Sequence, residues 1–148
     1  LELVLYGRPI TKKNSQIKTK NGIIQSQQYR CYEAELLHQL TGERRKVRIK
    51  RSLNKEVVRG NYEIQHQQRY RKNQIAVFDS KDRLHLQALF YYPTTGYPDL
   101  VGLIQSVQDI LQKAGVYPDD NQIALLDGST IVGKDKEYPR VEIRLKAI

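Results

Sequence analysis

Three aspartates flank one apolar segment of the chain. Asp99 comes directly before a run of apolar residues at helical spacing, and Asp119 and Asp120 come shortly after that run. Carboxylate oxygens are the ligands that Mg²⁺ prefers, and a cation held between them could polarise a phosphodiester and supply hydroxide for in-line attack. The pattern therefore admits metal-dependent phosphodiester hydrolysis, provided that the aspartates meet in space.

Each of these aspartates also has a purely structural explanation. Aspartate is a favoured helix N-cap because its side chain accepts the free amides of the first turn, and spacing alone favours this role for Asp99. Asp119-Asp120-Asn121 after Pro118 is typical turn chemistry. A helix of about fifteen residues is about 22 Å long, so the following strand must carry Asp120 back toward Asp99 if the two are to meet. The sequence alone leaves both interpretations open.

The net charge indicates a phosphate-rich partner. The 148 residues carry 25 Lys and Arg against 16 Asp and Glu, which leaves +9. Such a balance is typical of nucleic-acid binding, although it does not by itself exclude a basic protein that is merely soluble. Cys31 is the only cysteine, which excludes an intramolecular disulfide and favours a reducing, cytoplasmic setting. No apolar run approaches the ~18 residues of a membrane span, so we expect no membrane partner.

The loop from Thr11 to Gly22 carries lysines and no acidic residue. Its ammonium and amide groups could lie against a phosphate backbone, or the loop could be a solvated hairpin tip. Lys12, Lys13 or Lys136 could also neutralise the charge that develops during phosphodiester hydrolysis. The candidate DNA-binding residues are Lys12, Lys13, Asn14, Lys18, Lys20 and Lys136.

A second basic stretch, at about residues 43–81, has abundant Lys, Arg and Gln and poor periodicity. Tyr62 and Tyr70 lie among its cations, a mixture that can bind single-stranded or junction DNA through phosphate pairing and base stacking. The alternative is a long surface insertion without a role of its own. We expect a single domain over residues 1–148 that contains this basic insertion.

Apolar periodicity predicts the order strand, helix, strand, helix, strand, strand. Asp127-Gly128 could form a tight hairpin or a bulge within one long strand, and the bulge is favoured because the turn from Gly133 to Pro139 already reverses the chain. This order predicts an α+β domain with a mixed β-sheet and two main helices. The predicted strands are 3–6, 84–92, 123–132 and 141–145, and the predicted helices follow Ser26 as far as Gly42 and Asp99 as far as Gly115.

Three segments carry a resemblance to a known family. "GRPITKKNSQ", "PDLVGLIQSVQDILQKAGVYPDDNQI" and "DGSTIVGKDKEYPRVEIRL" together resemble the RusA family of Holliday-junction resolvases, typically carried by prophages. The family pattern is Asp-Leu-Asp-Asn at the start of a helix, followed after the helix by Asp-Asp, a polar residue and Gln. The resemblance implies a homodimeric, Mg²⁺-dependent endonuclease, with Mn²⁺ as a possible substitute, that nicks four-way DNA symmetrically. It also implies that Asp99 and Asp120 bind the metal, with Asp119 beside them, and that Asp99 can both cap the helix and face the cation.

The chain departs from the family pattern at the first motif. Val101 stands where the pattern has its second aspartate, Gly102 replaces the asparagine, and Gln105 occupies a basic position. Valine cannot bind a cation, so Asp119 becomes the candidate for a third carboxylate. Two alternatives to the nuclease follow: a catalytically impaired homodimer that binds branched DNA, and a basic phage assembly protein without preference for branched DNA.

Overall fold

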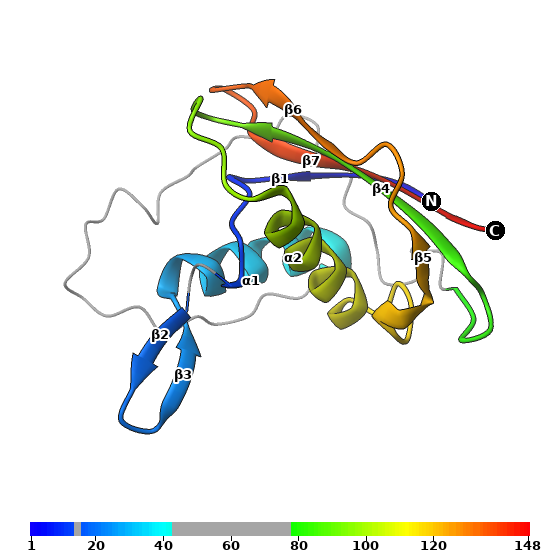
Figure 1. Cartoon of the computed structure of the whole chain (residues 1–148), viewed down its shortest axis with the longest axis horizontal. Helices are drawn as coiled ribbons and strands as arrows, with labels where there is room; N and C mark the ends of the chain where they lie inside the picture. The colour runs from blue at the N-terminus through cyan, green and yellow to red at the C-terminus, as the bar shows by residue number, and fades with distance from the viewer. Residues whose placement is uncertain (14–15, 43–77) are drawn as a thin grey trace.

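The computed structural model describes residues 1–13, 16–42 and 78–148, and these form one mixed β-sheet, two helices and a separate hairpin (Figure 1). The predicted α+β class with a mixed sheet and two main helices is confirmed. In chain order the elements are β1 (Glu2–Tyr6), β2 (Gln16–Thr19), β3 (Gly22–Gln25), α1 (Gln27–Thr41), β4 (Leu84–Tyr92), α2 (Leu100–Lys113), the 3₁₀ turn η2 (Asp120–Gln122), β5 (Ile123–Leu125), β6 (Thr130–Lys134) and β7 (Arg140–Ala147).

The sheet has β4 at its centre. β7 pairs with β4 on one side and with β1 beyond it, both in antiparallel fashion. On the other side of β4, β5 pairs with its beginning and β6 with its end, and both run parallel to β4. The bulge interpretation expected no chain reversal at Asp127-Gly128, and the chain does not reverse there. However, the segment forms two short strands, β5 and β6, and not the single long strand that was predicted.

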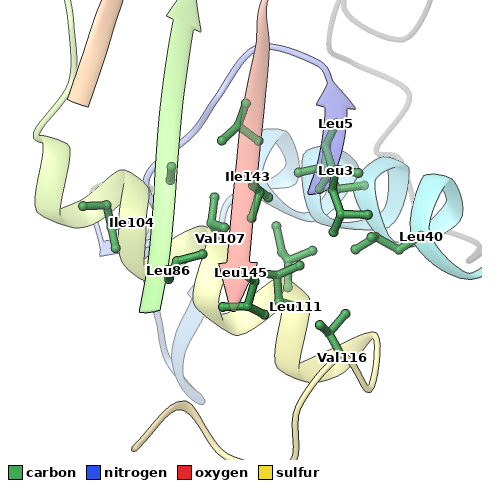
Figure 2. Packing of buried hydrophobic residues seen from close by; sticks show 14 of the residues in the cluster. Leu3, Leu5, Leu40, Leu86, Ile104, Val107, Leu111, Val116, Ile143 and Leu145 are labelled. Atoms are coloured by element: carbon green, nitrogen blue, oxygen red, sulfur yellow. The ribbon is translucent and has the colours of Figure 1, made fainter. Parts of the chain in front are cut away.

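Both helices cover one face of the sheet, and the core lies between the two layers (Figures 1 and 2). The sequence of β4 explains this arrangement. Buried and partly exposed residues alternate strictly along the strand from Leu84 to Tyr92. Successive side chains of a strand point to opposite faces, so one apolar set of β4 faces the helices and the other set faces away. Leu86 from β4, Ile143 from β7 and Val107 from α2 meet in this layer (Figure 2).

Helix α1 begins and ends as its sequence predicts. The Ser26 Oγ accepts a hydrogen bond from the Tyr29 amide at 3.2 Å. Gly42 closes the helix with a φ of +73°, a conformation that glycine adopts without a Cβ penalty, and its amide donates to the His38 carbonyl. Tyr29 and Tyr32 are buried, so they are core residues and not base-stacking groups, and burial raises the pKa of both phenols.

The first loop contains β2 and β3, two strands absent from the predicted order, which pair as a hairpin that projects from the two layers, as the hairpin-tip interpretation of this loop expected (Figure 1). Nearly every residue of the hairpin is exposed, so no buried face gave it an alternating pattern. Asn21-Gly22 at its turn was the available signal. Within the described ranges, none of the helices has the length and apolar character that crossing a bilayer requires.

Candidate functional site

Asp99 caps helix α2. Its Oδ2 accepts a hydrogen bond from the Gly102 amide at 2.8 Å, and its backbone carbonyl accepts one from the Leu103 amide at 3.1 Å. The residue is exposed and follows the short turn after the end of β4. The N-cap role is therefore confirmed, and it leaves the carboxylate at the surface, beside the partial positive charge of the helix N-terminus.

The close packing of the first loop at Thr11 explains why position 102 is a glycine. A Cβ at this position would lie 3.0 Å from Thr11 Cγ2 and 3.1 Å from Asp99 Oδ2. The first loop thus packs directly on the first turn of α2, at the place where the family pattern has asparagine. A larger residue at position 102 would push either Thr11 or the Asp99 carboxylate aside.

Lys12 fixes the same loop further along α2. Its amide donates to Ser106 Oγ at 2.9 Å, and its ammonium forms an ion pair with Asp109. Ser106 Oγ in turn donates to the Gly102 carbonyl. Lys12 therefore anchors the first loop to α2. Its ammonium lies beside Asp109, which is about 15 Å along α2 from Asp99.

At the other end of α2, Asp119 and Asp120 begin η2. Asp119 Oδ1 accepts a hydrogen bond from the Asn121 amide at 2.9 Å, and the Asp119 amide donates to Gln122 Oε1 at 3.2 Å. This reciprocal capping box holds Asp119 in a structural role. Asp120 is exposed at the first position of the turn. The turn interpretation is thus confirmed for both residues.

Gln122, the glutamine of the second motif, is a structural residue. Its Nε2 donates to the Asp79 carbonyl at 2.6 Å and to the Asp82 carbonyl at 3.0 Å, and the side chain is buried. Together with Asp119 it ties η2 to the turn that precedes β4. The motif therefore positions Asp120 through its neighbours.

We expect Gln122→Leu to lower the free energy of unfolding by about 2 kcal/mol, because the two hydrogen bonds from the buried Gln122 amide to the Asp79 and Asp82 carbonyls are lost and leucine offers no donor. For a chain of this size that corresponds to a fall in Tm of about 4–8 °C in a thermal melt. Gln28→Ala is the matched control, since Gln28 is exposed on α1 and its replacement should change Tm by about 2 °C or less. An unchanged Tm in Gln122→Leu would show that these hydrogen bonds add nothing.

One chain does not bring Asp99 and Asp120 together. They flank α2, whose 14 residues separate them by about 20 Å. The strand pairing also places the two aspartates at opposite ends of β4. Asp120 begins η2, which directly precedes β5, and β5 starts beside Leu84 at the beginning of β4, whereas Asp99 follows the end of β4. Among the described residues, no three His, Cys, Asp or Glu side chains gather into a metal-binding group. The return that the sequence required therefore does not occur within a single chain.

Tyr117 lies at the Asp120 end of the molecule. Its hydroxyl donates to the Gln108 carbonyl at 2.9 Å, and its ring is fully buried. Burial raises the pKa of this phenol, and the carboxylates of Asp120 and Asp109 raise it further. Tyr117 therefore stays neutral over the physiological range, and its hydroxyl ties the segment before η2 to α2.

The other predicted DNA-binding residues lie on two surfaces. Lys13, Lys18 and Lys20 are exposed on or before the projecting hairpin. Lys136 is exposed in the turn after β6, at the end of the sheet where β4 also ends, since Lys134 pairs with Tyr92. Asn14 and most of the basic insertion, residues 43–77, lie outside the described residues.

Arg8, Tyr92 and Tyr97 were missed by the sequence analysis. Arg8 Nε donates to the Tyr92 hydroxyl at 3.1 Å, and the guanidinium carbon lies 5.3 Å from the centroid of the same ring. Tyr97 meets Tyr92 edge to face, with ring centroids 6.2 Å apart. An aromatic residue in the turn directly before Asp99, where polar residues are usual, was the available signal.

Arg140 fixes the turn beside this group. Its guanidinium donates to Asp135 at 2.7 Å and to Glu142 at 2.8 Å, and it lies 3.7 Å from the centroid of the Tyr91 ring. The Tyr138 amide and then Arg140 lower the pKa of Asp135. The charge of Arg140 is therefore balanced internally, whereas Arg8, Lys134 and Lys136 are exposed to solvent at this end of the sheet.

A basic α+β domain that exposes a helix-capping carboxylate two residues after an exposed aromatic ring has the features of a nucleic-acid-processing protein. A family model described as Endodeoxyribonuclease RusA matches residues 6–146, nearly the whole chain. The chain therefore belongs to the RusA endodeoxyribonuclease family, as the three segments indicated. No curated protein sequence matched it.

Proposed function

We propose that this protein is a structure-selective DNA endonuclease that resolves four-way junctions as a homodimer, with a divalent metal ion. The observation that carries the proposal is the exposed carboxylate of Asp99, held at the start of α2 by the hydrogen bond from the Gly102 amide. Membership of an endodeoxyribonuclease family supports the reaction class.

Asp99 and Asp120 have the hard oxygen donors that suit Mg²⁺, with Mn²⁺ as a possible substitute. When bound, such an ion would polarise the scissile phosphate and lower the pKa of a bound water. Because the two carboxylates flank α2 about 20 Å apart, a single chain cannot offer both to one cation. We therefore propose that each site takes Asp99 from one chain and Asp120 from the second.

A two-fold axis beside the middle of α2 would achieve this exchange. It would set the two copies of the helix antiparallel, so that the start of each faces the end of the other. The outward stripe of α2 suits such a contact because it carries no charge in a chain rich in charged residues. The stripe consists of Val101, Gln105, Gln108 and Gln112, at positions i, i+4, i+7 and i+11.

The lysines at the surface would hold the DNA backbone. Lys13, Lys18 and Lys20 extend along the hairpin, and Lys136 lies at the end of the sheet from which Asp99 follows. Each phosphate contact releases counterions, so junction affinity should fall steeply with salt. The hairpin thus gives the dimer two projecting basic arms.

A second candidate function is a non-catalytic homodimer that binds branched DNA. Val101 favours it, since this side chain is 61% exposed at the position where the family pattern has an aspartate. A surface valine offers no ligand to a cation. Cleavage, and not binding, distinguishes the two functions.

The test is a gel assay on a synthetic four-way junction and on linear duplex, each with Mg²⁺, Mn²⁺ or EDTA. The proposal predicts paired nicks in the junction that require metal and are absent from the duplex. Junction binding without nicking under any metal would establish the second candidate. Equal binding to both DNAs without cleavage would indicate a basic assembly protein.

A further inference from the structure

Tyr97 presents an aromatic surface that the fold holds in place. Its side chain is 44% exposed, in the turn between the end of β4 and the start of α2. Its ring meets Tyr92 at an interplanar angle of 83°. In an edge-to-face pair at most one face of a ring is covered by the other, so Tyr92 leaves at least one face of the Tyr97 ring uncovered.

Tyr92 is a fixed support for this ring. It is only 6% exposed and ends β4, the central strand. Arg8 lies over it and donates to its hydroxyl at 3.1 Å, which locks the phenol from the side of the first loop. Arg8 itself is exposed, and no carboxylate in the described part of the chain pairs with it. The exposed Arg8 guanidinium, which contacts Tyr92, can therefore also bind a phosphate beside the two aromatic rings.

Tyr97 is also tied closely to Asp99. Only Pro98 separates them, so their Cα atoms lie at most about 7 Å apart. Proline fixes its own φ, and Asp99 is held by the cap hydrogen bond to Gly102. The separation of the two Cα atoms is thus limited by a short, restrained backbone segment, on the scale of one nucleotide step in a strand.

We propose that Tyr97, backed by Tyr92 and Arg8, stacks a nucleobase that is unpaired at the branch point of the DNA, next to the phosphate that lies at Asp99. Bases within a duplex are already stacked on both sides and offer no face to a protein ring. A base at a branch can be exposed, and aromatic side chains bind such bases with little regard to sequence. Tyr97 would therefore contribute selectivity for branched over linear DNA.

This inference rests on the proposed binding of branched DNA but not on cleavage. The test measures affinity for a four-way junction and for linear duplex in EDTA, where no metal-dependent cleavage occurs. Tyr97→Leu should weaken junction binding by about five- to a hundredfold, the range for one stacked base, and duplex binding by less than about twofold. Tyr97→Phe, which keeps the ring, should bind the junction as the parent chain does.

A junction lacking one base provides a second arm. Removing a base at one position flanking the branch should weaken the parent chain as Tyr97→Leu does, and should have no further effect on Tyr97→Leu. Ile148→Ala is the control, because this apolar side chain is also well exposed but lies at the opposite end of β4, where its amide donates to the Arg83 carbonyl. It should bind both DNAs normally.

Three outcomes would overturn the proposal: equal losses on junction and duplex, full binding by Tyr97→Leu, or additive effects of the missing base and Tyr97→Leu at every flanking position. The outcomes for the two proposals are separable. A chain that never cleaves but shows this dependence on Tyr97 keeps the stacking site and loses the nuclease. A chain that cleaves the junction but whose junction binding does not depend on Tyr97 keeps the nuclease and loses the stacking site.

Discussion

Asp99→Asn is expected to reduce cleavage of a four-way junction by more than about 100-fold while the fold stays intact. Residues that merely orient a metal ligand contribute about 10–100-fold, so loss of the ligand's charge should cost more. Asparagine is as good an N-cap as aspartate, so the hydrogen bond from Gly102 is replaced and not lost. Single-turnover cleavage, with a thermal melt alongside, measures both effects.

Asp127→Asn is the matched control for that variant. Asp127 is also exposed, but it lies in the link between β5 and β6, where its backbone carbonyl is hydrogen-bonded to His85. Removing its charge should change cleavage by less than about twofold. Equal rates for the parent chain and Asp99→Asn would eliminate Asp99 as a metal ligand and leave it as a helix cap alone.

Val101→Asp is expected to raise cleavage about tenfold or more when Mg²⁺ is limiting, because it supplies the carboxylate that the family pattern has at this position. The side chain is exposed on the first turn of α2, so the substitution creates no cavity, and a negative charge there is favourable to the helix dipole. The rate is measured over a Mg²⁺ titration.

Val101→Asn separates the carboxylate from simple polarity. It should leave the Mg²⁺ dependence of the parent chain unchanged, since an amide is a weaker ligand for a hard cation. The same gain in both variants would mean that removal of the exposed valine, and not the added ligand, raises the rate. No gain in either would mean that position 101 does not face the cation in this chain.

The sequence was informative wherever a buried face repeats along one element. The apolar stripe of α2 and the alternation in β4 each predicted an element that the structure contains. The caps at Ser26 and Gly42 were readable because capping depends on a few neighbouring residues. The hairpin of β2 and β3 was one of two interpretations of its loop, but its strands were not predicted because they bury almost nothing, and their signal is Asn21-Gly22 at the turn.

The candidate site was only partly predictable. The cap at Asp99 follows from local sequence, but its position relative to Asp120 depends on which end of β4 each aspartate joins, and that is set by the pairing of β5. The contact of Thr11 with Gly102 links residues far apart in sequence. Tyr97 was overlooked for a similar reason, since its support comes from Tyr92 and Arg8 in other elements.

The most direct measurement of the central claim is junction cleavage by a mixture of Asp99→Asn and Asp120→Asn chains, each inactive alone. If every site combines Asp99 of one chain with Asp120 of the second, a mixed dimer has one intact site and one doubly substituted site. Random exchange then restores about a quarter of the parent activity, because half of the dimers are mixed and each has one working site. If the mixture stays as inactive as its components after chain exchange has been verified, the account of a site shared between two chains is contradicted.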